Sequence, residues 1–221
     1  MNILIAGLAL ILTASAFAGV KQIYDKQYMV SLSEKPFAKY REKLSHSNEL
    51  YKLEYTLEIL PEHGGGVEKY TGYASKKKSL NPKSYRIDYL LPDPKNKEQK
   101  RNLATIVKKR TISGNFTKKK GTGIYNTQQG NTGLEFERKI KNGHFLFSFL
   151  HLYLLQNKPW KKSGKKFEFQ ALDEEGRIKT GIPPKPFTPV TGKAEYLGQD
   201  KVMGKKTSRF RIQWGNVKTE L

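Results

Sequence analysis

Between Tyr51 and Ile59 apolar and polar side chains alternate without a break, and this pattern constrains the fold more than any other feature of the chain. The odd positions hold Tyr, Leu and Ile, and the even positions hold Lys, Glu and Thr. Successive side chains of a β-strand point to opposite faces, so this segment buries one face and exposes the other. The same alternation recurs at Tyr85–Leu91, Lys166–Gln170 and Arg209–Trp214, and more weakly at Val67–Ala74, Leu103–Ile112, Gly121–Asn126, Leu134–Ile140 and Lys193–Leu197.

Turn-forming residues separate these segments, as at Pro61–Gly66, Pro92–Pro94 and Asn142–Gly143. Many short strands joined in this way are typical of antiparallel β proteins. We therefore predict a mainly β fold, with an antiparallel curved sheet that forms an incomplete barrel or a sandwich. Four prolines fall within Gly181–Gly192. Because proline lacks a backbone N–H, this segment is predicted to be a stiff loop rather than a paired strand.

Two segments depart from the strand pattern. Phe145–Gln156 is apolar nearly all round, rich in Leu and free of β-branched residues. These features predict one buried helix at about residues 145–156, packed into the concave face of the sheet. Pro36–Leu44 is predicted to be a short N-terminal helix, with Ser33 as its cap and Pro36 in its first turn.

The first eighteen residues differ from the rest of the chain. An apolar run at Ile3–Leu12 is followed by Ala16-Phe17-Ala18, with small residues at the two positions that a signal peptidase requires. We predict that residues 1–18 are a signal peptide cleaved before Gly19, and that the mature protein lies in the periplasm. An uncleaved membrane anchor is the alternative, but the sixteen residues from Ile3 to Ala18 make a short span.

Residues 19–221 are predicted to form a single β-rich domain, because no composition shift or repeat divides them. The strand pattern that begins at Arg209 runs to the end of the sequence at Leu221. We therefore expect either an edge strand there or a sequence truncated at the C-terminus.

Composition restricts the chemistry. The 221 residues include no cysteine, which excludes a disulfide scaffold and any thiolate metal site. The sequence contains no Gly-x-Ser-x-Gly, His-Glu-x-x-His or Gly-x-x-x-x-Gly-Lys motif. We predict a non-enzymatic protein with no catalytic residues, no metal and no cofactor.

Basic clusters are the one recurrent polar feature, and 41 Lys and Arg against 20 Asp and Glu give a formal net charge of +21. Clusters gathered along one rim of a sheet would attract polyanions such as phospholipid headgroups or lipopolysaccharide. The alternative is that the lysines only solubilise the protein and protect sheet edges. Nucleic acid is not expected as a partner of an exported protein without a known binding motif. The predicted binding residues are Lys76, Lys77, Lys78, Lys118, Lys119, Lys120, Lys161 and Lys162.

One region resembles a known group of proteins. Ser148–Leu155, followed by Pro159, Gly164 and Lys166–Phe169, resembles a family of uncharacterised bacterial periplasmic proteins that is known only as a domain of unknown function. Members of that family have a signal peptide, early Tyr-rich strands, an apolar mid-chain helix and a later Gly-containing strand like Tyr196–Gly198. The resemblance implies a periplasmic location and supplies no catalytic residue.

In organisation this likeness covers about Leu50–Trp214. In architecture alone, the chain also resembles the lipoprotein-carrier fold of the periplasm, an incomplete β-barrel that encloses helices and an apolar cavity. That likeness implies lipid carriage only by analogy of fold.

Three hypotheses about function remain. The first is a non-enzymatic envelope protein that binds an amphiphilic or anionic envelope component, such as a lipid, lipopolysaccharide or a lipoprotein. The second is a structural or interaction protein whose partner is another envelope protein. The third is a hydrolase of envelope polymers, which would need two carboxylates such as Asp88 and Glu137 in one cleft.

Overall fold

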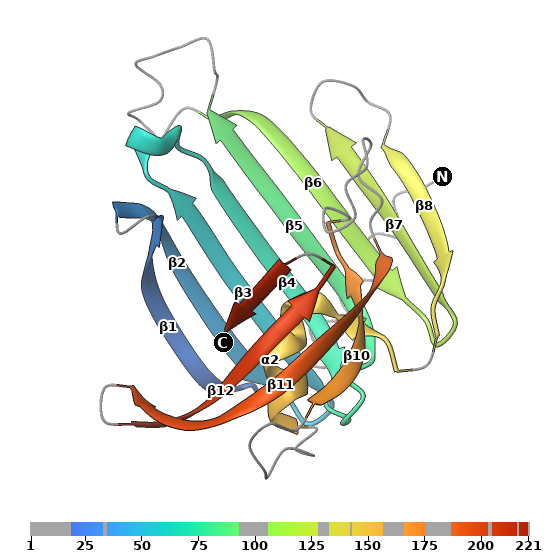
Figure 1. Ribbon diagram of the computed structural model, residues 1–221. Helices are drawn as coiled ribbons and strands as arrows, with labels where there is room; N and C mark the ends of the chain where they lie inside the picture. Colours follow the sequence, from blue (N-terminus) through green and yellow to red (C-terminus); the bar gives the residue numbers. More distant parts are fainter. Residues whose placement is uncertain are drawn as a thin grey trace. The chain divides into compact units, whose positions relative to one another are not determined.

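The computed structural model describes residues 19–32, 35–92, 106–127, 133–141, 143–156, 166–175, 187–202, 205–215 and 217–220. The chain divides into two compact units, one of residues 1–76 and 83–137 and the other of residues 77–82 and 138–221. Each unit is built on its own β-sheet (Figure 1). The predicted mainly β fold is therefore confirmed, with a large antiparallel sheet, a second, curled sheet and one short α-helix in the described part of the chain.

The first unit is an eight-stranded sheet in which every strand pairs with the next one along the chain. Because successive strands reverse direction, the β2–β3, β4–β5 and β6–β7 connections leave the same end of the sheet. A short 3₁₀ turn, η1 (Pro61–His63), lies in the β3–β4 connection at the other end. The strands are β1 (Lys21–Leu32), β2 (Lys35–His46), β3 (Leu50–Ile59), β4 (Val67–Ser75), β5 (Pro82–Pro92), β6 (Ile106–Phe116), β7 (Lys120–Thr127) and β8 (Leu134–Lys139).

Strand β2 replaces the predicted helix at Pro36–Leu44, so that prediction is wrong. Ala38 and Leu44 are buried on one face of the strand, whereas Lys39 and Arg41 are exposed on the other. This alternation outweighs the helix-start signals. Pro36 is tolerated because β3 begins to pair with β2 only at Ala38, so the missing N–H of Pro36 leaves no gap in that ladder.

A ladder of aromatic rings crosses one face of the first sheet. The rings belong to consecutive strands from β1 to β6, and neighbouring centroids lie 4.8 to 6.4 Å apart. Cross-strand aromatic pairs contribute about 0.5–1.5 kcal/mol each beyond the area they bury. The aromatic ladder consists of Tyr28, Tyr40, Tyr55, Tyr70, Tyr85 and Phe116.

Burial changes along the aromatic ladder. Tyr70 and Tyr85 are only 2% and 3% exposed, whereas Tyr28 on the edge strand β1 is 47% exposed. The Tyr70 ring lies over Gly72, where a Cβ atom would come within 2.2 Å of the Tyr70 hydroxyl oxygen. A larger residue at this position would therefore displace the ring from the stack.

The second unit is a five-stranded sheet with the order β13-β12-β11-β10-β9. Its strands pair in an antiparallel manner except for the parallel β9–β10 pair. The Phe169 ring covers Gly192 on the neighbouring strand, where a Cβ atom would lie 2.2 Å from the ring. The strands are β9 (Phe145–Leu146), β10 (Lys166–Asp173), β11 (Thr188–Val202), β12 (Lys205–Trp214) and β13 (Val217–Glu220).

The predicted helix at residues 145–156 is shorter than expected. Phe145–Leu146 is strand β9, Phe147–Phe149 forms the 3₁₀ turn η3, and α2 covers only Leu150–Gln156. Buried Glu174 explains where the turn starts, because its carboxylate accepts hydrogen bonds of 3.1 Å from the backbone N–H groups of Phe147 and Ser148. These donors would otherwise be unsatisfied at the start of a helix.

Helix α2 packs against the sheet of its own unit, and strands β10–β12 of that sheet curl around the helix (Figure 1). The Tyr153 ring stacks on Phe145 with centroids 4.1 Å apart, and the Phe147 ring meets Trp214 of β12 edge to face at 5.1 Å. Leu152 and Leu154 are buried, whereas Leu155 is 47% exposed. The helix therefore has one exposed side, and apolar side chains do not surround it completely.

Two predictions near the C-terminus need correction. Strand β11 begins at Thr188, inside the segment Gly181–Gly192 predicted to be a loop, of which residues 181–186 lie outside the described residues. Pro189 pairs with β10, but β12 joins β11 only from Gly192 onward, so the missing N–H faces no partner strand. The predicted continuous strand from Arg209 instead turns after Trp214, where Gly215 has φ 51°, and returns as β13.

We expect Leu152→Asp to lower the free energy of unfolding by several kcal/mol, because it places an unpaired charge in a buried position. Leu155→Asp in the same helix is the matched control and should change stability by less than about 0.5 kcal/mol. Urea denaturation of both variants measures the difference. Equal effects of the two substitutions would contradict the packing described for α2.

Candidate binding surfaces

The predicted lysine clusters occupy connections between strands. Lys76–Lys78 follows β4, Lys118–Lys120 joins β6 to β7, and all six lysines are exposed. Lys161 and Lys162 lie outside the described residues. Lys76 and Lys118–Lys120 belong to the first unit, and their connections leave the same end of its sheet. The sheet thus brings Lys76 and the Lys118–Lys120 cluster to one end, β4 and β6 being about 10 Å apart.

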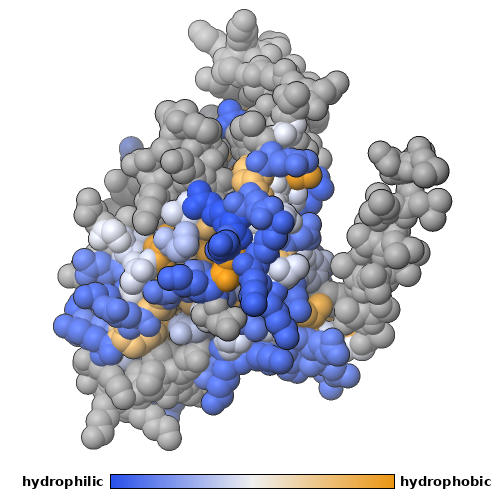
Figure 2. Space-filling model, turned by 90° about the vertical axis from the view of Figure 1, so that its right-hand side faces the viewer, coloured by the Kyte–Doolittle hydropathy of each residue, from blue (hydrophilic) through white to orange (hydrophobic). Residues whose placement is uncertain are grey.

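Side-chain contacts, one an ion pair and one a hydrogen bond, divide the lysines of this end into two kinds. Lys120 Nζ lies 2.6 Å from Glu137 Oε2 on β8, and Lys76 Nζ lies 2.9 Å from His46 Nδ1. Lys118 and Lys119 protrude from the turn that the Thr117 hydroxyl closes against Lys120. Hydrophilic residues dominate the described surface in the view of Figure 2, where hydrophobic residues form only small separate areas. Lys118 and Lys119 are therefore the lysines best placed to meet an external anion.

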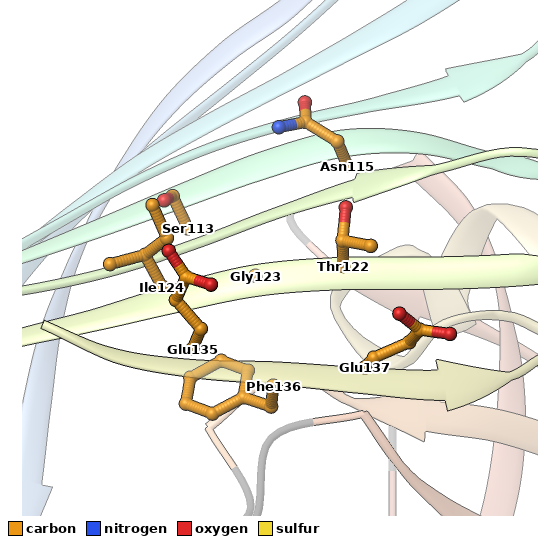
Figure 3. A pocket seen from close by; sticks show the side chains of 8 residues that line it. All are labelled: Ser113, Asn115, Thr122, Gly123, Ile124, Glu135, Phe136 and Glu137. Carbon is orange, nitrogen blue, oxygen red and sulfur yellow. The ribbon is translucent and has the colours of Figure 1, made fainter.

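A polar groove lies beside this lysine turn, on the exposed face of β6, β7 and β8 (Figure 3). It has a volume of about 330 Å³. Glu135 lies near Ser113 and Ile124 in this view, Glu137 lies nearer Thr122, and Phe136 points to the other side of β8. The groove residues are Ser113, Asn115, Thr122, Gly123, Ile124, Glu135, Phe136 and Glu137.

The second unit has a hollow of its own, with a volume of about 360 Å³. Three cationic side chains line it, but two ion pairs of 3.5 Å, Arg211–Glu195 and Lys193–Glu168, offset part of their charge. The lining residues come from the three neighbouring strands β10, β11 and β12, and all but Ala194 are polar. They are Lys166, Lys193, Ala194, Glu195, Arg211 and Gln213.

Carboxylates fix the hydroxyl groups of the aromatic ladder at its exposed side. Glu42 on β2 accepts hydrogen bonds from the hydroxyls of Tyr24 and Tyr40, the second at 2.6 Å. Glu68 accepts one from Tyr55 at 2.7 Å, and Lys26 Nζ lies 5.0 Å above the Tyr24 ring. This half-exposed part of the face is consequently both aromatic and polar.

The environment of Glu42 also changes the acidity of its two tyrosines. Burial raises the pKa of Tyr24 and Tyr40 above the ordinary value of 10.0, and their hydrogen bonds to Glu42 raise the pKa further. The folded state therefore favours the protonated phenols. The unfolded chain releases these protons near pH 10, so folding stability that is present below pH 10 is lost as pH rises above it.

We predict that the free energy of unfolding of the wild type falls as pH rises above about 10. The double variant Tyr24→Phe/Tyr40→Phe should show a shallower fall, because it lacks the two shifted groups. Urea denaturation between about pH 8 and pH 11 measures both profiles. Tyr28→Phe removes an exposed hydroxyl and should follow the wild type. Parallel profiles for the wild type and the double variant would contradict this assignment.

The carboxylates considered for a hydrolase do not form a pair. Asp88 lies on β5 and Glu137 on β8, and with β6 and β7 between them their strands are about 14 Å apart. Asp88 is instead held by Arg86 at 2.8 Å and by the Thr111 hydroxyl at 2.7 Å. A glycosidase pair requires a separation of about 5–9.5 Å. Glu135 and Glu137 do share the groove, but both are exposed.

Two features are absent from the described residues. No described helix has the length and apolar character needed to cross a membrane. The same residues contain no group of three or more His, Cys, Asp or Glu side chains that could hold a metal ion.

No known protein family, curated protein or solved structure matches the chain. The resemblances to the periplasmic family and to the lipoprotein carriers therefore stay predictions.

Proposed function

We propose that the protein is a non-enzymatic, exported envelope protein that binds an anionic, amphiphilic component of the bacterial envelope. The observation that carries the proposal is the convergence of Lys76 and Lys118–Lys120 at one end of the first sheet. Exposed lysines near an anionic surface contribute about 1 kcal/mol each. The signal-like segment at residues 1–18 supports the export part of the proposal.

The half-exposed side of the aromatic ladder supports an amphiphilic ligand. Tyr28 and Val30 on β1 are 47% and 36% exposed and lie on the same face as the half-buried Tyr40. An apolar chain could cover these side chains while its headgroup reaches a lysine. The hollow of the second unit offers further cations, but its acidic side chains make it a weaker anion site.

Vesicle binding tests the lysines. The double variant Lys118→Gln/Lys119→Gln should bind phosphatidylglycerol vesicles about thirtyfold more weakly at low salt, since two lysines are worth roughly 2 kcal/mol. Binding should also weaken as salt rises, because exposed charges are screened over about 10 Å at 0.1 M salt. Lys39→Gln/Lys69→Gln removes two exposed lysines from the strands and is the charge-matched control. Co-sedimentation measures all three proteins.

Two outcomes would remove the support for this function. Wild-type protein that binds phosphatidylcholine and phosphatidylglycerol vesicles equally at low salt would show that the lysines are only a solvated surface. An equal loss in the two double variants would show that net charge, and not this end of the sheet, determines binding.

A second candidate function, a structural or interaction protein, is supported by strand β1. Seven large hydrophobic side chains are exposed among the described residues, and five of them lie in or directly before this strand. Strand β1 has twelve residues, whereas the edge strands β8, β13 and β9 have six, four and two. Long apolar edge strands readily pair with another strand. The five residues are Val20, Ile23, Tyr28, Met29 and Val30.

This candidate predicts self-association through β1, since an antiparallel edge can pair with its own copy about a two-fold axis. Met29→Lys should abolish a concentration-dependent rise in sedimentation coefficient, because it replaces an exposed apolar side chain of the edge strand with a charge. Gln27→Lys adds the same charge to the same face without removing an apolar side chain, and should retain most of the association. A wild type that stays monomeric at all concentrations would contradict self-association through β1.

A further inference from the structure

The side chains that line the groove on β6–β8 differ in chemistry from the lysines of the turn beside it. Five of its side chains present oxygen atoms: the hydroxyls of Ser113 and Thr122, the amide of Asn115, and the carboxylates of Glu135 and Glu137. Hydroxyls and amides both donate and accept hydrogen bonds, whereas carboxylates only accept. A ligand that satisfies all five must therefore bring several donors together with some acceptors.

Strand geometry arranges these groups in two rows. Ser113 of β6 is directly opposite Ile124 of β7, and Asn115 is directly opposite Thr122. Residues two apart on one strand are separated by about 7 Å, and neighbouring strands by about 4.8 Å. The polar groups are consequently spread over a shallow surface and do not converge on one point. This spacing suits an extended ligand with several polar groups better than a single ion.

One apolar side chain lies among the polar ones. Ile124 is 41% exposed and has a carboxylate neighbour, Glu135, in the groove (Figure 3). It offers a surface on which the C–H groups of a ligand can pack while hydroxyl groups reach the surrounding oxygens. Sugar rings combine these two kinds of surface.

The charges of the groove select against an anion. Glu135 and Glu137 would repel a negatively charged ligand, and Lys120, two residues before Thr122, is engaged by Glu137 at 2.6 Å. The ion pair also holds the Glu137 carboxylate in position beside Thr122. A neutral ligand with many hydroxyl groups meets no such repulsion. The volume of about 330 Å³ is at the lower end of the roughly 300–1,000 Å³ of ligand pockets.

We propose that this groove binds the sugar rings of a neutral oligosaccharide. The inference goes beyond the proposed function and does not rest on it, because it concerns a different ligand and a different set of side chains. Ser113, Asn115, Thr122 and the two glutamates would hold hydroxyl groups, and Ile124 would contact a ring face.

Nuclear magnetic resonance titration tests the groove. The probes are neutral tetrasaccharides of N-acetylglucosamine, glucose and mannose, added to ¹⁵N-labelled protein. At least one probe should shift backbone amide signals of β6–β8 and leave those of β1–β3 unchanged. Thr122→Val keeps the β-branched shape but loses the hydroxyl, so the Kd should rise about three- to tenfold. Thr56→Val makes the same change on β3, outside the groove, and should bind as the wild type does.

Three outcomes would overturn the inference: no shift on β6–β8 with any of the three sugars, equal affinity of wild type and Thr122→Val, or shifts that calcium alone produces and the sugars do not. Amide signals outside the groove check that Thr122→Val is folded. Vesicle binding through Lys118 and Lys119 is a separate measurement, so a negative sugar titration leaves the proposed function standing and a negative vesicle result leaves the groove standing.

Discussion

A sheet of eight consecutive strands has to keep its register over long, exposed segments, because a slip of one residue would exchange its two faces. The aromatic ladder supplies this restraint for strands β1 to β6. Each ring contacts the ring on the next strand, and Tyr55 and Tyr70 stack at 4.8 Å with their planes only 4° apart. A slip would move these rings to opposite faces. Backbone hydrogen bonds can join neighbouring strands in several registers, and the stacked rings select one of these registers.

The register held by the rings also determines what the opposite face can do. With the aromatic side chains on one face, the intervening positions carry hydroxyl, amide and charged groups on the other, as Ser113 and Thr122 do. The alternating direction of the strands collects every second connection at the same end, which is where Lys76 and Lys118–Lys120 lie. The candidate binding surfaces therefore follow from strand periodicity and strand order.

The sequence predicted the half-buried strands well because burial of one face leaves an alternating pattern, as in β3. It did not predict β1, which exposes Ile23, Met29 and Val30 and so does not alternate. The predictions at Pro36 and Pro189 were wrong, because both prolines lie in strands at points where one side has no partner strand. The lysine turn was visible as a run of like residues. The groove was not, because Ser, Thr, Asn and Glu at exposed strand positions look alike wherever they occur, and only strand pairing brings Asn115, Thr122 and Glu137 together.

The Lys120–Glu137 ion pair connects the lysine turn to the groove. It uses one lysine of the turn to fix a carboxylate of the groove, and it leaves Lys118 and Lys119 for an external anion. An exposed ion pair of this kind adds little stability, typically less than about 1 kcal/mol, so its effect is chiefly on position. Acidic oxygens then lie along the groove and positive charge lies at its end. An anionic group placed in the groove would meet Glu135 and Glu137, whereas at the turn it would meet Lys118 and Lys119, so the two surfaces select ligands of different charge.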